Sequence, residues 1–170
     1  MCYHLTKHIA SKEGKMMIRK YQPSDLEPLR QITAICFEDV SIDRNIEAKF
    51  GVIGEVDWKQ RKMSHINADV EANPDGVFVA EIDGEIAGYI TTRINHWTQI
   101  GGIPNLAVQP KFQRRGLGKQ LIETALAHFK AEGMRYAKIE TLEQNQISST
   151  FYPQMGFVEV ARQIHYVRPL

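Results

Sequence analysis

The sequence has few of the residues that cross-link a small protein or bind a structural metal. Two of its 170 residues are cysteine, Cys2 and Cys36, and their spacing fits neither a zinc site nor a disulfide framework. No apolar run is long enough to span a bilayer, and residues 1–10 lack the apolar core of a secretory signal. We therefore expect a cytoplasmic protein with free thiols, no metal and no membrane partner.

The chain also lacks a strong net charge. It carries 21 Lys and Arg against 20 Asp and Glu, a formal net charge of +1 at pH 7. No global field attracts a polyanion, and basic and aromatic residues are not interleaved as on nucleic-acid-binding surfaces. Nucleic acid is therefore not an expected partner, although a protein that binds it through Lys111, Arg114, Arg115 and Lys119 is a rival hypothesis.

The length and composition are those of one globular domain. The chain is 43% hydrophobic, enough to form a core over 170 residues. Residues 1–15 show no periodicity and are interpreted as a disordered extension before a single domain at residues 16–170. Strand and helix patterns alternate there without internal repeats, which predicts an α/β (α+β) fold.

The expected elements follow from apolar periodicity and from turn residues such as Asp83-Gly84. Strands are predicted at residues 16–22, at 77–94 as a hairpin, and at 103–108, 136–142 and 157–167. Helices are predicted at residues 23–37, within 57–73 and from 117 to 132, with a short helical or turn segment at 145–156.

A basic, glycine-containing segment lies between a predicted strand and a predicted helix. Its residues 113–119 read QRRGLGK. A helix N-terminus presents unpaired amides and a positive dipole end, glycine permits close approach, and the cations can meet phosphate oxygens. The segment therefore predicts a pyrophosphate site. It is not a P-loop, because Gln120 follows Lys119, and not a dinucleotide fingerprint, because Leu121 replaces the third small residue.

The pattern Gln113-x-x-Gly116-x-Gly118 after Asn-Leu-Ala-Val resembles the acetyl-CoA motif of GCN5-related N-acetyltransferases. A second match lies downstream, where Asn145 precedes Tyr152 by seven residues and Gly-Phe follows. The resemblance covers residues 103–157. It implies this family's fold, a central mixed, mostly antiparallel sheet of six to seven strands flanked by helices. It also implies an acyltransferase that uses acetyl-CoA as co-substrate and moves its acetyl group to a primary amine by direct attack in a ternary complex.

The resemblance implies a role for each matched position. The strand residues would hold the acetyl carbonyl and the pantetheine arm through their backbone, and the glycine segment would bind the pyrophosphate. Tyr152 would act as general acid toward the thiolate, and Glu140 matches the base of the ribosomal-protein N-terminal acetyltransferase branch, ahead of His96, His165 and Glu81. The implied cofactor-binding residues are Leu106, Ala107, Val108, Gln113, Arg114, Arg115, Gly116, Leu117, Gly118, Lys119, Asn145 and Tyr152.

Plainer interpretations stand beside these roles. Tyr152 could simply pack in the core, and Glu140 could be a solvated residue on a strand face. The charged side chains between Arg44 and Lys62 are interpreted as a solvated helix face. A protein of this fold could also bind acetyl-CoA as a sensor without turnover. The acceptor amine is left open among small molecules, peptide N-termini and lysines, and a homodimer is expected only by analogy of fold.

Overall fold

The computed structural model describes residues 15–170. The expected extension at residues 1–15 thus lies, except for Lys15, outside the described residues, and the division into extension and domain stays a prediction. The strands are β1 (Met16–Lys20), β2 (Val77–Ile82), β3 (Glu85–Arg93), β4 (Ile100–Val108) and β5 (Tyr136–Ile139). The α-helices are α1 (Leu26–Cys36), α2 (Ile42–Phe50), α3 (Trp58–Ala72), α4 (Leu117–Ala131) and α5 (Gln146–Gln154), with short 3-10 turns at Pro23–Asp25, Pro74–Gly76 and Pro110–Phe112.

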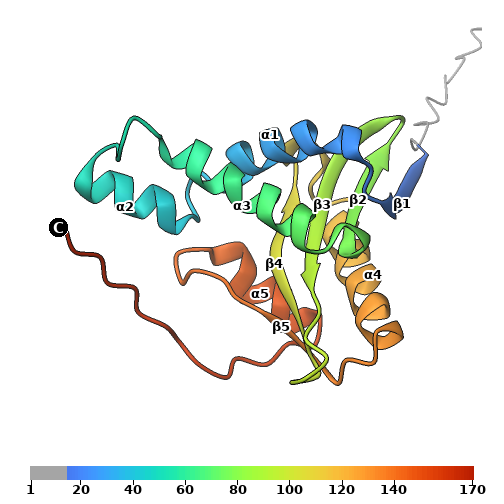
Figure 1. Cartoon of the computed structure of the whole chain (residues 1–170). Helices are drawn as coiled ribbons and strands as arrows, with labels where there is room; N and C mark the ends of the chain where they lie inside the picture. The colour runs from blue at the N-terminus through green and yellow to red at the C-terminus, as the bar shows by residue number, and fades with distance from the viewer. Residues whose placement is uncertain (1–14) are drawn as a thin grey trace, which may run out of the picture.

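The strands form one sheet in the order β1-β2-β3-β4-β5. Neighbours from β1 to β4 are antiparallel, whereas β4 and β5 are parallel. Helices α1 and α3 cover one face of the sheet and α4 covers the other (Figure 1). The predicted fold class, a mixed and mostly antiparallel sheet flanked by helices, is confirmed, with five strands in the described part of the chain instead of six to seven.

The predicted hairpin between β2 and β3 is present. Ile82 is opposite Glu85, so Asp83 and Gly84 form a two-residue loop. Both loop residues have left-handed backbone, with φ of +50° and +84°. This geometry matches the right-handed twist of the flanking strands, which is why an Asp-Gly pair favours it.

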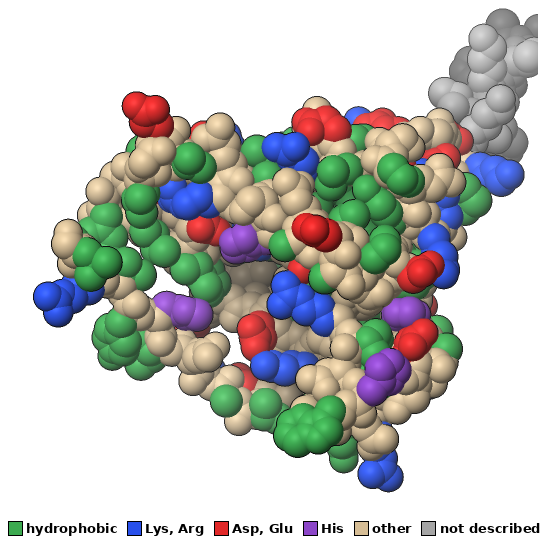
Figure 2. Space-filling model, viewed as in Figure 1, with side chains coloured by type: hydrophobic (Ala, Val, Ile, Leu, Met, Phe, Trp, Pro, Cys, Tyr) green, Lys and Arg blue, Asp and Glu red, His purple; other side chains and the backbone are tan. Residues whose placement is uncertain are grey.

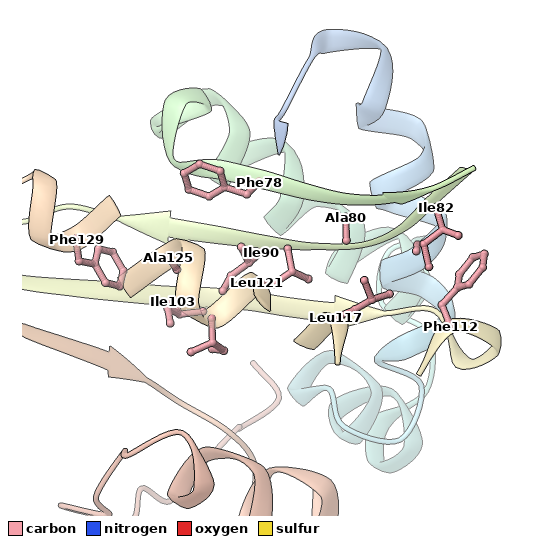
Figure 3. Packing of buried hydrophobic residues seen from close by; sticks show 12 residues of the cluster. Phe78, Ala80, Ile82, Ile90, Ile103, Phe112, Leu117, Leu121, Ala125 and Phe129 are labelled. Carbon is pink, nitrogen blue, oxygen red and sulfur yellow. The ribbon is translucent and has the colours of Figure 1, made fainter. Parts of the chain in front are cut away.

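Helix α4 is held on the sheet by the apolar stripe that the sequence predicts. Leu121, Ile122, Ala125 and Phe129 are each at most 2% exposed. They pack against side chains of β2, β3 and β4, among them Phe78 (Figure 3). Full burial of one large apolar side chain stabilises the folded state by about 1.5–3 kcal/mol. Because several such side chains anchor α4 to the sheet, they also fix the position of its N-terminus relative to β4.

Strands β4 and β5 diverge after a short paired stretch. Their parallel pairing runs from Ile100 opposite Tyr136 to Ile103 opposite Ile139. The next residue of β4, Pro104, has no N–H to donate, and the register of β4 against β3 shifts by one residue in the same place. β5 therefore ends at Ile139 and not at residue 142 as predicted, which leaves an open fork between the two strands.

The strand predicted at residues 157–167 is wrong. These residues form neither helix nor strand, and from residue 158 on they are exposed. Alternating apolar residues produce a strand only where a partner edge is within reach, and here the segment extends from α5 towards α2, away from the sheet (Figure 1). In the described residues, no helix is long and apolar enough to cross a membrane.

Candidate active site

The N-terminus of α4 is an exposed, basic turn. Arg114 and Gly116 have left-handed backbone, with φ of +62° and +78°, and no side chain caps the helix. The first amides of a helix have no intrahelical partner, and left-handed residues can gather N–H groups into a concavity that binds anions. Arg114, Arg115 and Lys119 are exposed and add positive charge. The turn therefore has the donors and the charge that a pyrophosphate needs.

The free edge of β4 lies beside this turn. The Gln109 N–H donates to the Ala87 carbonyl of β3 at 2.8 Å. Successive residues of a strand direct their N–H and C=O groups to alternate edges, so Leu106 and Val108 direct theirs away from β3, into the fork. Ala107 faces β3 instead, and its side chain packs in the cluster beneath α1 and α3. Two of the three predicted strand residues thus offer backbone groups to a ligand in the fork.

The Val108 carbonyl fastens the turn and α1 to the strand. Gln113 Nε2 donates to it at 3.0 Å, and Cys36 Sγ donates at 3.4 Å. Burial raises the pKa of the Cys36 thiol to about 11, so it stays protonated at neutral pH and is a poor nucleophile. Gln113 therefore positions the basic turn, whatever further contact it makes with a ligand.

Helix α5 brings Tyr152 to the same region. A Cβ placed on Gly118 would lie 3.3 Å from Phe151 Cζ, so α5 packs against the first turn of α4. The Tyr152 ring contacts Phe151 and Phe157, with centroids 5.5 Å and 6.0 Å away. Burial raises the pKa of Tyr152 to about 12. Its hydroxyl keeps its proton at neutral pH and is available as a hydrogen-bond donor or general acid.

Asn145 lies at the start of α5, where its Nδ2 donates to Thr141 Oγ1 at 3.1 Å. The adjacent Gln144 Oε1 accepts a hydrogen bond from Asn45 Nδ2 of α2 at 2.9 Å. This contact joins α2 to the loop that follows β5. Figure 2 shows a hollow in this face of the molecule, with acidic and basic side chains at its rim.

Glu140 follows the last residue of β5 and therefore stands at the mouth of the fork. Its Oε1 lies 2.6 Å from Lys138 Nζ, and its side chain is 68% exposed. A solvated carboxylate in this place can exchange protons with water, either alone or as part of a relay. The position leaves both interpretations open, a base at the fork and a solvated carboxylate beside the end of β5.

The three alternative candidates for the base, His96, Glu81 and His165, do not lie at the mouth of the fork. His96 Nε2 is 3.9 Å from Glu132 Oε2, at the C-terminal end of α4 and so at the opposite end of that helix from the basic turn. Glu81 accepts a hydrogen bond from Arg19 Nε within the sheet at 2.9 Å. His165 belongs to the exposed C-terminal segment. Glu140 is the candidate that directly follows the divergence of β5 from β4.

A buried polar network occupies the α3 side of the sheet. Asp69 is 1% exposed. It accepts hydrogen bonds from Thr91 Oγ1 at 2.8 Å, Asn105 Nδ2 at 2.7 Å and Arg93 Nη2 at 2.7 Å. Thr91 Oγ1 also accepts from the Asn105 N–H at 3.1 Å. The network joins α3, β3 and β4 where the β4 register shifts, so it helps to define the fork.

Lys62 extends from α3 into this network. Its Nζ donates to Asn105 Oδ1 at 2.7 Å and lies 4.2 Å from the centroid of the Phe37 ring. Burial lowers the pKa of Lys62, while the charges of Asp43 and Asp69 act in the opposite direction. The interpretation of the charged residues between 44 and 62 as a solvated helix face is therefore wrong at Lys62.

Sequence reasoning missed this network, although two signals were present. Asn105 interrupts an apolar strand, and Asp69 falls three residues after the buried Ile66 on the apolar side of α3. A polar residue in an apolar register indicates a buried hydrogen bond, but the sequence does not say which residue completes it.

The chemistry of the site suits an anionic ligand with an extended arm. Backbone amides and guanidinium groups complement phosphate, and the free edge of β4 can pair with an amide-containing chain. In residues 15–170, His, Cys, Asp and Glu side chains do not gather in groups that could hold a metal ion.

The comparisons with known proteins agree with this arrangement. The model of the acetyltransferase (GNAT) family matches residues 29–157. A mycothiol acetyltransferase of Streptomyces avermitilis is 32% identical over 107 residues, which cover 63% of this chain and 35% of that protein. The chain spans about a third of the length of the curated relatives it matches first.

Two solved structures have a similar fold. The PaiA N-acetyltransferase of Thermoplasma acidophilum, in complex with coenzyme A, aligns with a TM-score of 0.64 and 21% identity over 83% of this chain and 88% of that one. A GNAT family acetyltransferase of Brucella melitensis, in complex with acetyl-CoA, aligns with a TM-score of 0.63 and 24% identity over 86% of this chain and 84% of that one. At these identities the similarity establishes the fold.

Proposed function

The chain belongs to the acetyltransferase (GNAT) family, and we propose that it is an enzyme that transfers the acetyl group of acetyl-CoA to a primary amine. One observation carries the proposal. The contact of Phe151 with Gly118 brings a protonated tyrosine, Tyr152, to the basic turn at the N-terminus of α4. The anion site suits the pyrophosphate of CoA, and a protonated tyrosine suits the departure of its thiolate, so the two features together fit a CoA-dependent transfer.

In the proposed complex, the amides of residues 114–119 bind the pyrophosphate, with Arg114, Arg115 and Lys119 adding charge. The backbone groups of Leu106 and the N–H of Val108 bind the pantetheine arm, which lies in the fork in the manner of an added strand. The fork is open because β5 pairs only with the first part of β4. Asn145, at the start of α5, provides a further polar group to that arm.

The reaction proceeds by direct attack in a ternary complex. Glu140 takes a proton from the acceptor ammonium, directly or through water, because a peptide α-amine with a pKa of about 8 is largely protonated at neutral pH, and an alkyl amine with a pKa of about 10 almost entirely so. The free amine attacks the thioester carbonyl carbon and forms the C–N bond, while N–H groups of β4 stabilise the oxyanion. The C–S bond then breaks, and the Tyr152 hydroxyl donates its proton to the sulfur. The acylated nitrogen loses its extra proton to water to give the neutral amide, Glu140 releases the proton it took, and Tyr152 regains one from solvent.

Tyr152→Phe tests the general acid. We expect kcat to fall by about 10²-fold or more, with acetyl-CoA affinity nearly unchanged, because the ring packing is kept. Thiol release measures the rate, and titration calorimetry measures the affinity. The matched control is Tyr136→Phe, since Tyr136 is 72% exposed on β5. Unchanged turnover in Tyr152→Phe excludes the acid role, and binding without turnover in the unmodified protein supports the CoA sensor instead.

Glu140→Gln tests the base. The variant should lose activity most strongly at low pH, where little free amine is present without a base, and recover in part as the pH rises. Glu143→Gln is the control, because Glu143 is an exposed carboxylate near the same loop that pairs with Arg162. A pH–rate profile that coincides with that of the control assigns the base to another group.

For the acceptor, we propose the N-terminus of a peptide first, because Glu140 matches the base of that branch. The mycothiol acetyltransferase relative favours an amine on a small molecule as the second candidate. A panel of peptides with free or blocked N-termini, lysine peptides, polyamines and amino sugars separates them by kcat/KM. We place the reaction in the cytoplasm and propose a homodimer, with neither nucleic acid nor membrane as partner.

A further inference from the structure

Asn105 directs its side chain to the face of the sheet that lies opposite α4 and α5. Leu106 and Val108 pack on the α4 face, in the cluster that also includes residues of α5. Ala107 packs on the other face, beneath α1 and α3, and Asn105 Nδ2 donates to Asp69 Oδ2 of α3 at 2.7 Å. Because side chains alternate between the two faces of a strand, Asn105 lies on the α3 side of the position next to Leu106.

This arrangement determines the side from which an acceptor approaches, on the premise of the proposed function. A pantetheine arm that lies in the fork as an added strand keeps its amides, and the thioester beside Leu106, near the plane of the sheet. A nucleophile attacks a carbonyl carbon from above or below the plane of the carbonyl group. Helices α4 and α5, with Tyr152, occupy one of these two sides. The acceptor amine therefore approaches from the side of α3.

Lys62 places an ammonium group on this side of β4. Its Nζ donates to Asn105 Oδ1 at 2.7 Å and lies 4.2 Å from the centroid of the Phe37 ring. An ammonium group has three N–H donors, and the Asn105 side chain accepts one of them. Since Asn105 directly precedes Leu106, the Lys62 ammonium lies close to the position where the proposed complex holds the thioester.

The carboxylates whose charges act on Lys62 are held by other cations. Asp69 accepts a hydrogen bond from Arg93 Nη2 at 2.7 Å, and Asp43 Oδ1 lies 3.5 Å from Arg61 Nε. Burial lowers the pKa of Lys62, and the charges of Asp43 and Asp69 do not fully offset this effect. A partly buried ammonium with unused donors and no carboxylate of its own is well suited to a carboxylate that a ligand brings.

We propose that Lys62 binds a carboxylate of the acceptor, and that the protein prefers amines whose molecules carry a carboxylate a few bonds from the nitrogen. The proposal rests on the acetyl transfer proposed above. Glu140 follows β5 and Lys62 belongs to α3, so the ammonium end of the acceptor lies at an anion and its carboxylate end at a cation. The acidic first residue of a peptide and a small amino acid both supply this chemistry.

Matched acceptors test the preference. Two peptide amides that begin with aspartate or with asparagine differ only in this charge, and γ-aminobutyrate and its amide provide the same comparison for a small molecule. The strength of charge-assisted hydrogen bonds predicts a kcat/KM about 10- to 100-fold higher for the carboxylate member of a pair. The pair that shows the preference identifies the source of the carboxylate. Equal kcat/KM values within both pairs overturn the proposal and leave acetyl transfer itself intact.

Lys62→Met tests the assignment to this side chain. Methionine keeps most of the length without the charge, so the ratio of the two kcat/KM values should fall close to one, whereas Lys62→Arg should keep part of the preference. Lys59→Met, which changes an exposed lysine of the same helix, is the matched control and should keep the full ratio. A purely structural role of Lys62 lowers both kcat/KM values together, and a ratio that survives Lys62→Met overturns the proposal.

A binding measurement separates the carboxylate site from the proposed function. The acetylated form of each acceptor is titrated calorimetrically into protein saturated with coenzyme A. The carboxylate member of the preferred pair should bind at least about 10-fold more tightly than its amide, and Lys62→Met should remove the difference. Equal affinities within both pairs overturn the carboxylate site, whatever the turnover. Failure to acetylate any amine refutes the proposed function instead, and the difference in binding still decides the role of Lys62.

Discussion

The two faces of the sheet are built in different ways. The α4 face buries an apolar cluster that includes Leu117, Leu121 and Phe129. The face under α1 and α3 buries apolar residues too, but it also encloses Asp69 and Asn105. Apolar packing tolerates exchange of one hydrophobic side chain for another of similar volume, whereas a buried network needs every partner. The α4 face, which carries the basic turn, is thus stabilised mainly by apolar packing. The face under α1 and α3 depends in addition on particular hydrogen bonds.

The largest effect should follow from a cavity on the α4 face. Leu121→Ala removes a side chain that is fully buried, and we expect a loss of about 2–5 kcal/mol in the free energy of unfolding. Urea denaturation measures it. Glu123→Ala, on the exposed side of the same helix, is the control and should change stability little. A small effect of Leu121→Ala would mean that the cluster collapses around the gap.

A smaller effect is expected from the polar network on the other face. Asp69→Asn keeps the shape but turns an amide N–H₂ towards donors, so about 1–3 kcal/mol should be lost. Asp75→Asn, an exposed carboxylate paired with Lys20, serves as control and should be nearly neutral. If the apolar replacement Asp69→Leu proves as stable as the original chain, the network is not needed for folding, and the contrast between the two faces fails.

The smallest effect on stability should come from the turn itself. Gly116 has a φ of +78° and open space around its Cα, so Gly116→Ala should cost about 1–2 kcal/mol. Gly133, with a φ of +75° and equally open space beyond the other end of α4, is the matched control. Both changes should lower stability alike, but only Gly116→Ala should weaken acetyl-CoA binding. If the two variants bind acetyl-CoA with equal affinity, the turn is not part of the acetyl-CoA site.

Local patterns predicted those parts of the molecule in which a segment and its neighbour in the chain form the structure together. The Asp83-Gly84 hairpin and the stripe on α4 belong to this class. The motif at residues 113–119 placed the basic turn correctly at a helix N-terminus. Such features depend on spacing within one stretch of sequence, which the sequence displays directly.

Features that depend on distant partners were not predicted. The alternation at residues 157–167 indicated a strand, but alternation does not reveal which sheet edge, if any, a strand will pair with. Lys62 appeared to be one more charge on a polar helix until Asn105, far along the chain, turned out to accept its hydrogen bond. The roles of Glu140 and Tyr152 stay predictions, because position alone does not establish a proton transfer.

Pro104 gives the fork a property that does not depend on any ligand. This residue has no amide hydrogen, and β4 shifts register beside it. The hydrogen-bonded pairing of β4 with β5 therefore does not continue past this point. A molecule that enters the gap meets backbone groups that are already separated, and it does not have to break a ladder to reach them. Preorganisation of this kind strengthens binding by removing the cost of rearrangement. In this chain the missing amide hydrogen of Pro104 keeps the fork between β4 and β5 open before any ligand binds.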